Sequence, residues 1–250
     1  MALSTGTDGP VIELRQYRLY PGTRERLIAL FDREFVETQE AVGMQVLGQF
    51  RDLDDPDSFV WLRQFADMPA RAQALAAFYG GPVWAAHRDA ANATMVNSDN
   101  VLLLRPAAPD TGFAPATRPR CASDANAVGA GLVTCTICSL APRTEDAFAQ
   151  MFDASVLPLL QQAGARILAR LVTHQGPNTF PRLPVREGET VFAWLSGFDS
   201  EQAHAQHLEV LAGIDTWRTQ VLPAMDRLMW RREQVLRLAP TARSLLGAPA

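Results

Sequence analysis

Charged and aromatic side chains occupy alternate positions in two segments that the sequence predicts to be strands. Glu13, Arg15 and Tyr17 alternate in one segment, and Trp61 and Arg63 alternate in the other. Successive side chains of a strand point to opposite faces, so each set shares one face. If these faces meet inside a barrel, they form an aromatic-walled pocket with two guanidinium groups. Arginine binds carboxylate, phosphate or enolate oxygens through paired hydrogen bonds, so this pocket would suit a small anionic or aromatic ligand.

The simpler alternative is that Glu13 pairs with an arginine on a solvated face. Trp84 lies downstream on a predicted helix and completes the candidate ligand set. His87 follows three residues later on nearly the same helical face, where it could serve as a general base or a haem ligand. A histidine that is merely packed or solvated is the competing interpretation. The candidate ligand-binding residues are therefore Glu13, Arg15, Tyr17, Trp61, Arg63 and Trp84, with His87 as the one catalytic candidate.

Two further groups have the spacing of metal or redox sites. His204 and His207 stand three residues apart, but no third ligand is apparent, so we predict no metal and interpret both as part of a solvated helix face. Cys135 and Cys138 spell C-x-x-C within a predicted strand, where small buried hydrophobes are expected rather than a redox pair. No phosphate loop, dinucleotide fingerprint or zinc spacing occurs, so no cofactor is predicted beyond the haem option at His87.

Composition excludes several classes of partner. The 250 residues carry a formal net charge of −4 and are 48% hydrophobic, which leaves no basic footprint for nucleic acid. Apolar runs are far shorter than a bilayer requires. The segment Met1–Pro10 has neither a secretory nor a transit pattern, so a cytoplasmic location is expected.

The elements that position these residues occur twice along the chain. Residues 59–84 match residues 192–217 with ten identities at an offset of 133, and the upstream segments match at an offset of 121. The change of offset places an insertion at residues 174–189, which we interpret as a surface loop or, alternatively, a lid over a pocket. Each copy is predicted to run strand, helix, strand, strand, helix, strand, which is the ferredoxin-like arrangement.

The predicted fold class is therefore α+β, with two tandem ferredoxin-like units that form an intrachain dimeric α/β-barrel. Each four-stranded sheet has one bare face, and the two copies can bury those faces together as an intrachain pseudo-dimer. Exposed strand edges could extend the pairing to a homodimer. The expected divisions are 1–106 for the first domain, 107–131 for a linker, 132–240 for the second, diverged domain and 241–250 for a loosely held tail.

The first copy resembles the NIPSNAP family. The resemblance rests on the E-L-R-x-Y strand and proline-glycine turn of residues 11–22, the V-L-G strand of residues 46–50, the strand of residues 59–65 and Trp84. It implies a dimeric α/β-barrel fold of ferredoxin-like units, but it carries no catalytic residue set. The second copy departs from the pattern, with Thr134, Thr136, Cys138 and Ser196 in place of Glu13, Arg15, Tyr17 and Arg63.

A single pocket per chain, in the first copy, is expected from this asymmetry. The leading hypothesis is a NIPSNAP-like protein of unassigned biochemical role that binds a small anionic or aromatic ligand. One alternative is a small-molecule monooxygenase or isomerase of the dimeric α/β-barrel type. The other is a protein interaction module whose aromatic faces are packed solid.

Overall fold

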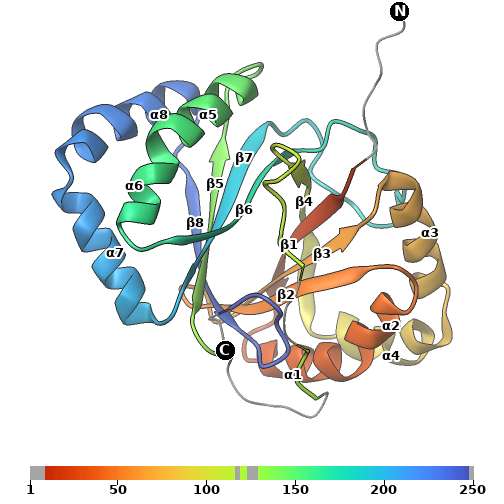
Figure 1. Cartoon of the computed structure of the whole chain (residues 1–250). Coiled ribbons are helices and arrows are strands. Elements are labelled where there is room, and N and C mark those ends of the chain that lie inside the picture. Colours follow the sequence, from red (N-terminus) through yellow and green to blue (C-terminus); the bar gives the residue numbers. More distant parts are fainter. Residues whose placement is uncertain (1–8, 116–118, 123–128, 248–250) are drawn as a thin grey trace, which may run out of the picture.

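The computed structural model describes residues 9–115, 119–122 and 129–247, and this part of the chain forms eight strands in one closed barrel (Figure 1). The strand order is β1-β3-β2-β8-β5-β7-β6-β4, which confirms the predicted fold class. The first repeat consists of β1 (Val11–Leu19), α1 (Arg24–Leu30), η1 (Phe31–Phe35), α2 (Val36–Glu40), β2 (Gln45–Asp52), β3 (Ser58–Phe65), α3 (Met68–Tyr79), α4 (Pro82–Asn92) and β4 (Met95–Pro106). The second repeat consists of β5 (Leu132–Ser139), α5 (Glu145–Met151), η2 (Phe152–Val156), α6 (Leu157–Gln162), β6 (Arg166–Thr173), β7 (Val191–Phe198), α7 (Glu201–Gly213), η3 (Trp217–Val221), α8 (Leu222–Leu228) and β8 (Gln234–Pro240).

The two repeats close the barrel by pairing strands across two seams. β8 pairs with β2 through Asp52 and Leu238, and β4 pairs with β6 through Leu104 and Thr173, both antiparallel. The last strand of each repeat thus pairs with a strand of the other repeat, and the chain forms the predicted intrachain pseudo-dimer. The eight described strands leave no free edge for a second copy to pair with, so the expected route to a homodimer through strand edges is absent from this part of the chain.

The barrel interior is a packed and predominantly aliphatic core. Ile12 and Leu14 of β1 point inward and pack with residues of both repeats, among them Leu62, Val133 and Leu195. An eight-stranded barrel is just wide enough for side chains to fill it. The expectation that Glu13 and Arg15 meet their partners inside the barrel is therefore wrong, because the opposite, apolar face of β1 fills that space.

Helices cover the outer faces of the two halves, α1–α4 on the first and α5–α8 on the second (Figure 1). The first helix of each repeat contains a π-helical turn at the same position, η1 and η2, offset by 121 residues. Both helices are followed by a glycine with positive φ, Gly43 at 93° and Gly164 at 94°, a conformation that glycine adopts without steric penalty. The duplication therefore extends to irregular backbone features.

The inserted loop, residues 174–189, crosses from the second repeat to the first. The Phe180 ring stacks on Tyr79 of α3 at a centroid distance of 6.0 Å. Asn178 and Thr179 accept hydrogen bonds from Arg71 Nη1 at 3.1 and 3.4 Å. The loop therefore covers part of the outer face of the first repeat and is not a free surface loop, whereas a role as a lid over a pocket stays a prediction.

The expectation of a loosely held tail after residue 240 is wrong for the residues that the structure describes. Thr241, Arg243 and Ser244 are buried, and Arg243 donates hydrogen bonds to the Asp32 carbonyl and the Glu37 carboxylate. Within the expected linker, Ala107 donates to the Arg170 carbonyl at 3.0 Å. Residues 1–8, 116–118, 123–128 and 248–250 lie outside the described residues, and so does most of the segment expected to lack a leader. No helix in the described ranges is long and apolar enough to cross a membrane.

Candidate functional site

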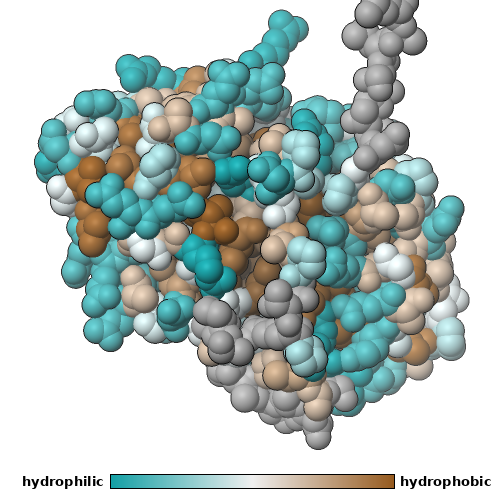
Figure 2. Space-filling view, in the orientation of Figure 1, coloured by the Kyte–Doolittle hydropathy of each residue, from teal (hydrophilic) through white to brown (hydrophobic). Residues whose placement is uncertain are grey.

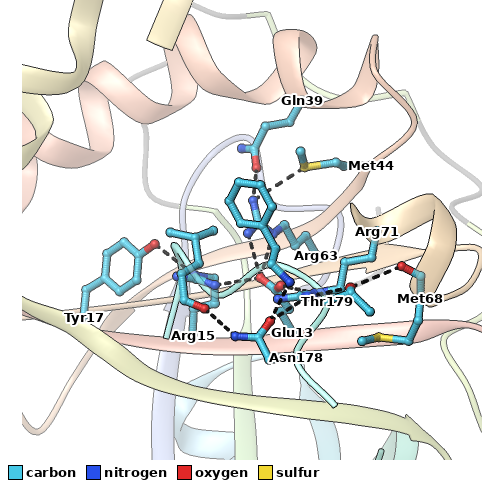
Figure 3. Close-up of polar contacts among 12 residues, drawn as sticks. Glu13, Arg15, Tyr17, Gln39, Met44, Arg63, Met68, Arg71, Asn178 and Thr179 are labelled. Atoms are coloured by element: carbon cyan, nitrogen blue, oxygen red, sulfur yellow. Dashed lines mark hydrogen bonds and ion pairs between the residues drawn. The ribbon is translucent and has the colours of Figure 1, made fainter. Parts of the chain in front are cut away.

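Glu13 lies at the centre of a buried cluster on the outer face of the first repeat (Figure 3). Its Oε2 accepts hydrogen bonds from Arg15 Nη1 at 2.7 Å and Arg63 Nε at 2.8 Å, and its Oε1 accepts one from Arg71 Nε at 2.7 Å. All four side chains are at most 1% exposed. The alternative of an ion pair on a solvated face is therefore wrong, because helices and the inserted loop cover this face of the sheet.

Arg15 and Arg63 each donate a further hydrogen bond to another buried side chain. Arg15 Nε donates to the Tyr17 hydroxyl at 2.9 Å, and Arg63 Nη1 donates to Gln39 Oε1 at 2.8 Å. The Trp61 ring lies 5.5 Å from the Arg15 guanidinium and 5.0 Å from that of Arg63. Three arginines face one carboxylate, and such ring contacts help to offset the excess positive charge.

The electrostatics of the cluster favour an ionised Glu13. Burial opposes ionisation, but the charges of Arg63, Arg15 and Arg71 hold the pKa of Glu13 far below its usual range. Arg71 was not among the candidate residues because it lies on α3, and its partners are more than 50 residues away in sequence. Sequence spacing carries no signal for such a contact.

The structure brings five of the six candidate ligand residues into this cluster and separates the sixth. Trp84 packs against Phe35 and Tyr79, with centroid distances of 5.7 and 4.9 Å. His87 is 32% exposed, and its Nε2 lies 3.5 Å from a Glu34 carboxylate oxygen. A ligand role for the six residues stays a prediction, and the near-complete burial of Glu13, Arg15 and Arg63 gives a ligand no access in this conformation.

The equivalent position in the second repeat is a cavity of about 700 Å³ between the sheet and the helices. The repeat offsets place Thr134 at the position of Glu13, Thr136 at that of Arg15 and Ser196 at that of Arg63. Long charged side chains are thus replaced by short hydroxyl side chains, and the space that they fill in the first repeat is open in the second. The cavity is lined by Thr134, Thr136, Leu160, Trp194, Ser196, His204, His207, Leu208, Leu211, Trp217, Leu222, Met225, Asp226, Met229, Trp230, Arg231, Arg232, Glu233 and Val235.

Hydroxyl groups and imidazoles supply the uncharged polar part of the lining. No described residue hydrogen-bonds the hydroxyls of Thr134, Thr136 or Ser196, so these groups are available to a ligand. His204 and His207 are only 7% and 6% exposed, and the prediction of a solvated helix face is wrong for both. Burial lowers the pKa of each ring, which favours neutral imidazoles. Among the described residues no group of three His, Cys, Asp or Glu side chains could hold a metal ion.

Hydrophobic side chains form the walls and the rim of this cavity. Trp194, Trp217 and Leu211 belong to the core between β7 and the helices. At the rim, Trp230 is 62% exposed and Leu208 is 51% exposed. Figure 2 shows hydrophobic side chains gathered on the second-repeat side of the molecule, from its helices toward the central strands. Large apolar groups at the mouth of a cavity are typical of a ligand entrance.

A second, polar cavity of about 640 Å³ opens at one end of the barrel. It shares Arg231 and Arg232 with the first cavity and is otherwise lined by Asn97, Asp99, Asn100, Ile137, Ser139, Arg186 and Gln234. Arg231 Nε donates to Ser139 Oγ at 2.7 Å, and Arg186 pairs with Glu189 at 2.6 Å. The two cavities therefore meet at the segment between α8 and β8.

The two strand cysteines are buried on opposite faces of β5, as predicted. Cys135 packs inside the barrel and Cys138 packs under the helices. Burial raises the pKa of the Cys135 thiol to about 12 and that of Cys138 even further. Both thiols therefore behave as small hydrophobes rather than as nucleophiles.

Comparison with known protein families identifies the family of the first repeat. Residues 12–109 match the NIPSNAP family model. The first repeat is a NIPSNAP domain. A NIPSNAP-like domain protein from Burkholderia xenovorans is 24% identical over 45% of this chain and 97% of its own length, with a TM-score of 0.39. None of the curated proteins matches the sequence.

Other solved structures resemble the whole chain rather than the NIPSNAP domain alone. An anthrone oxidase-like protein is 13% identical, with a TM-score of 0.64 over 97% of this chain and 98% of its own. A candidate monooxygenase from Lactobacillus acidophilus NCFM is 10% identical, with a TM-score of 0.57 over 93% of this chain and 94% of its own. At these identities the likeness shows a shared fold, the two-repeat barrel.

Proposed function

We propose that this protein binds a small aromatic ligand in the cavity of its second repeat. The proposal is based on a difference between the two repeats at equivalent positions of their sheets. Glu13 and three arginines fill the space between sheet and helices in the NIPSNAP domain, whereas Thr134, Thr136 and Ser196 leave it open in the second repeat. A cavity between a sheet and its helices, with apolar walls and a few convergent polar groups, has the character of a ligand site.

The lining indicates the chemistry of the ligand. Trp194 and Trp217 offer ring faces to an aromatic body, and the three hydroxyls offer hydrogen bonds to a phenol, ketone or similar group on its edge. Arg231 and Arg232 lie at the rim, where they could pair with an acidic substituent that reaches the mouth. The proposed ligand is thus of the aromatic class expected from the sequence, but its proposed site lies in the second repeat instead of the first.

A second candidate function is oxidation of such a ligand by O₂. Its support is the whole-chain likeness to an anthrone oxidase-like protein, which acts as a fold-level analogy only. Oxidation of a ring CH₂ group to a carbonyl by one O₂, with release of one water, needs no further reductant. Product formation from dithranol, a hydroxylated anthrone, under air would support this candidate, and the absence of turnover would leave the binding function alone.

Binding of 4-nitrophenol, measured by isothermal titration calorimetry, tests the proposal. Ser196→Arg restores the residue type of the first repeat at the floor of the cavity, and we expect it to weaken binding at least tenfold, about 1.4 kcal/mol. Ala90→Arg adds the same charge to an exposed position of α4 and serves as the control, with binding unchanged. Equal affinity of the wild type and Ser196→Arg would overturn the proposal.

A further inference from the structure

The His207 ring is held in one tautomer by the backbone. Its Nδ1 lies 3.0 Å from the carbonyl oxygen of Ala163, at the end of α6. A carbonyl oxygen can only accept a hydrogen bond, so Nδ1 carries the proton and Nε2 carries a lone pair. No described residue donates a hydrogen bond to Nε2. The ring thus offers the cavity a fixed proton acceptor.

His207 is specific to the second repeat. The position equivalent to His207 in α3 is Ala74, which is buried in the core of the first repeat. His204, one turn away, contacts Phe198 and stacks on His207 at 6.3 Å, but no described residue hydrogen-bonds its ring. The tether to Ala163 therefore distinguishes His207 from its neighbour.

The groups around His207 suit the products of a proton transfer. The hydroxyls of Thr134, Thr136 and Ser196 line the same cavity and can donate hydrogen bonds to a developing oxyanion. The charged groups of the lining, Asp226, Arg231, Arg232 and Glu233, belong to α8 and to the segment before β8, and they compensate one another in sign. His204 is the other titratable group on α7 that faces the cavity.

We propose that His207 Nε2 is the proton acceptor of the second-repeat cavity, acting on an acidic O–H or C–H group of the bound aromatic ligand. The inference rests on the proposed function and deepens it. In the step, the ligand O–H or C–H bond breaks and an Nε2–H bond forms, while the electron pair stays on the ligand. The imidazolium then returns its proton to water. The ligand class is accordingly a weakly acidic aromatic, such as a phenol or an enolisable aromatic ketone.

The ionisation of bound 4-nitrophenol tests this inference, because its phenolate absorbs visible light and its phenol form does not. Bound to the wild type, the probe gains a cationic partner on ionisation, so we expect its apparent pKa to fall by about 1 to 3 relative to free probe. His207→Asn keeps an N–H donor for the Ala163 carbonyl and removes Nε2, and we expect it to abolish this fall while the probe still binds. Ala90→Arg, on the exposed face of α4, is the control and should retain the fall. His204→Gln and Arg232→Gln change two other nitrogen-bearing groups of the cavity lining and show whether either of them, rather than His207, causes the fall.

The outcomes separate this inference from the function on which it rests. If the probe binds and ionises equally in the wild type and in His207→Asn, the proton-acceptor role is overturned and the binding function stands. If the fall is lost only in Arg232→Gln, the rim arginine stabilises the phenolate and the inference is also overturned. If no variant binds the probe, both the inference and the proposed function fail. Circular dichroism of each variant verifies its fold. His207→Gln is a second substitution of the same residue, to be used if His207→Asn does not fold.

Discussion

At the residue scale, Glu13 illustrates how one carboxylate can organise a buried surface. Three arginines from β1, β3 and α3 converge on its two oxygens, and each arginine contacts a further partner. Their charges are taken out of water at a cost that only close pairing offsets. Removing the carboxylate leaves all three guanidinium groups without their shared counter-ion, so the cluster depends on this residue more than on any single arginine.

Glu13→Gln should lower the free energy of unfolding by about 3 to 5 kcal/mol, the loss expected when one partner of a buried ion pair is removed. The exposed pair of Glu25 with Arg51 provides the control, because Glu25 is 62% exposed and Glu25→Gln should cost less than about 1 kcal/mol. Urea unfolding of the two variants and the wild type makes the measurement. Equal losses for the two variants would mean that the cluster contributes no more than a surface pair.

Glu13 also makes the stability of the folded protein depend on pH. The folded-state pKa of Glu13 lies below its ordinary value of 4.5, so its stabilisation is fully present above that pH and is lost as the pH falls below it. We therefore expect the stability difference between the wild type and Glu13→Gln to be constant from pH 7 to pH 5 and to shrink below pH 4.5. A difference that stays unchanged to pH 3 would contradict the assignment of an ionised Glu13.

At the scale of elements, the alternation of β1 predicted which side chains share a face but not which face points inward. Both faces of β1 are buried from Val11 to Tyr17, so hydropathy could not distinguish the barrel interior from the surface beneath the helices. The order of strands and helices followed from the duplication. An alignment of the two repeats could have predicted the cavity. Three large charged side chains of the first repeat are replaced by small ones at the equivalent positions of the second, and such replacements leave space. The aligned pairs are Glu13 with Thr134, Arg15 with Thr136 and Arg63 with Ser196.

The inserted loop links the two repeats in a way that no local pattern indicated. Contacts such as Asn178 with Arg71 join residues 107 positions apart, and a turn-rich sequence specifies no partner at that distance. The Phe180 ring on Tyr79 is the apolar part of this cover. The loop is therefore an element of the first repeat in space, although it belongs to the second in sequence.

Phe180→Ala should uncover α3 at a cost of about 1 kcal/mol, the usual contribution of an aromatic pair. Hydrogen exchange measured by mass spectrometry should then quicken in peptides of α3 and remain unchanged in α7 of the second repeat. Glu187→Ala changes an exposed residue of the same loop and should leave both helices unaffected. Faster exchange confined to the loop would show that it does not support the first repeat.

At the scale of the whole molecule, the duplication closes the barrel within one chain and lets its halves diverge. Both repeats keep the π-helical turn, the glycine that follows the first helix and the pairing across the seams. Because the shared barrel core is predominantly aliphatic and contributed by both halves, the outer face of one half can change without opening the interior. The NIPSNAP domain carries the buried charge cluster, and the second repeat carries the cavity.

The crystal structure of the protein with 4-nitrophenol at saturating concentration tests this division most directly. We expect electron density for the probe between the sheet and α7–α8, within contact of Trp194, Ser196 and His207, with the Glu13 cluster unchanged. Density for the probe beside Arg15 and Trp61 in the first repeat, with the second-repeat cavity empty, would contradict it.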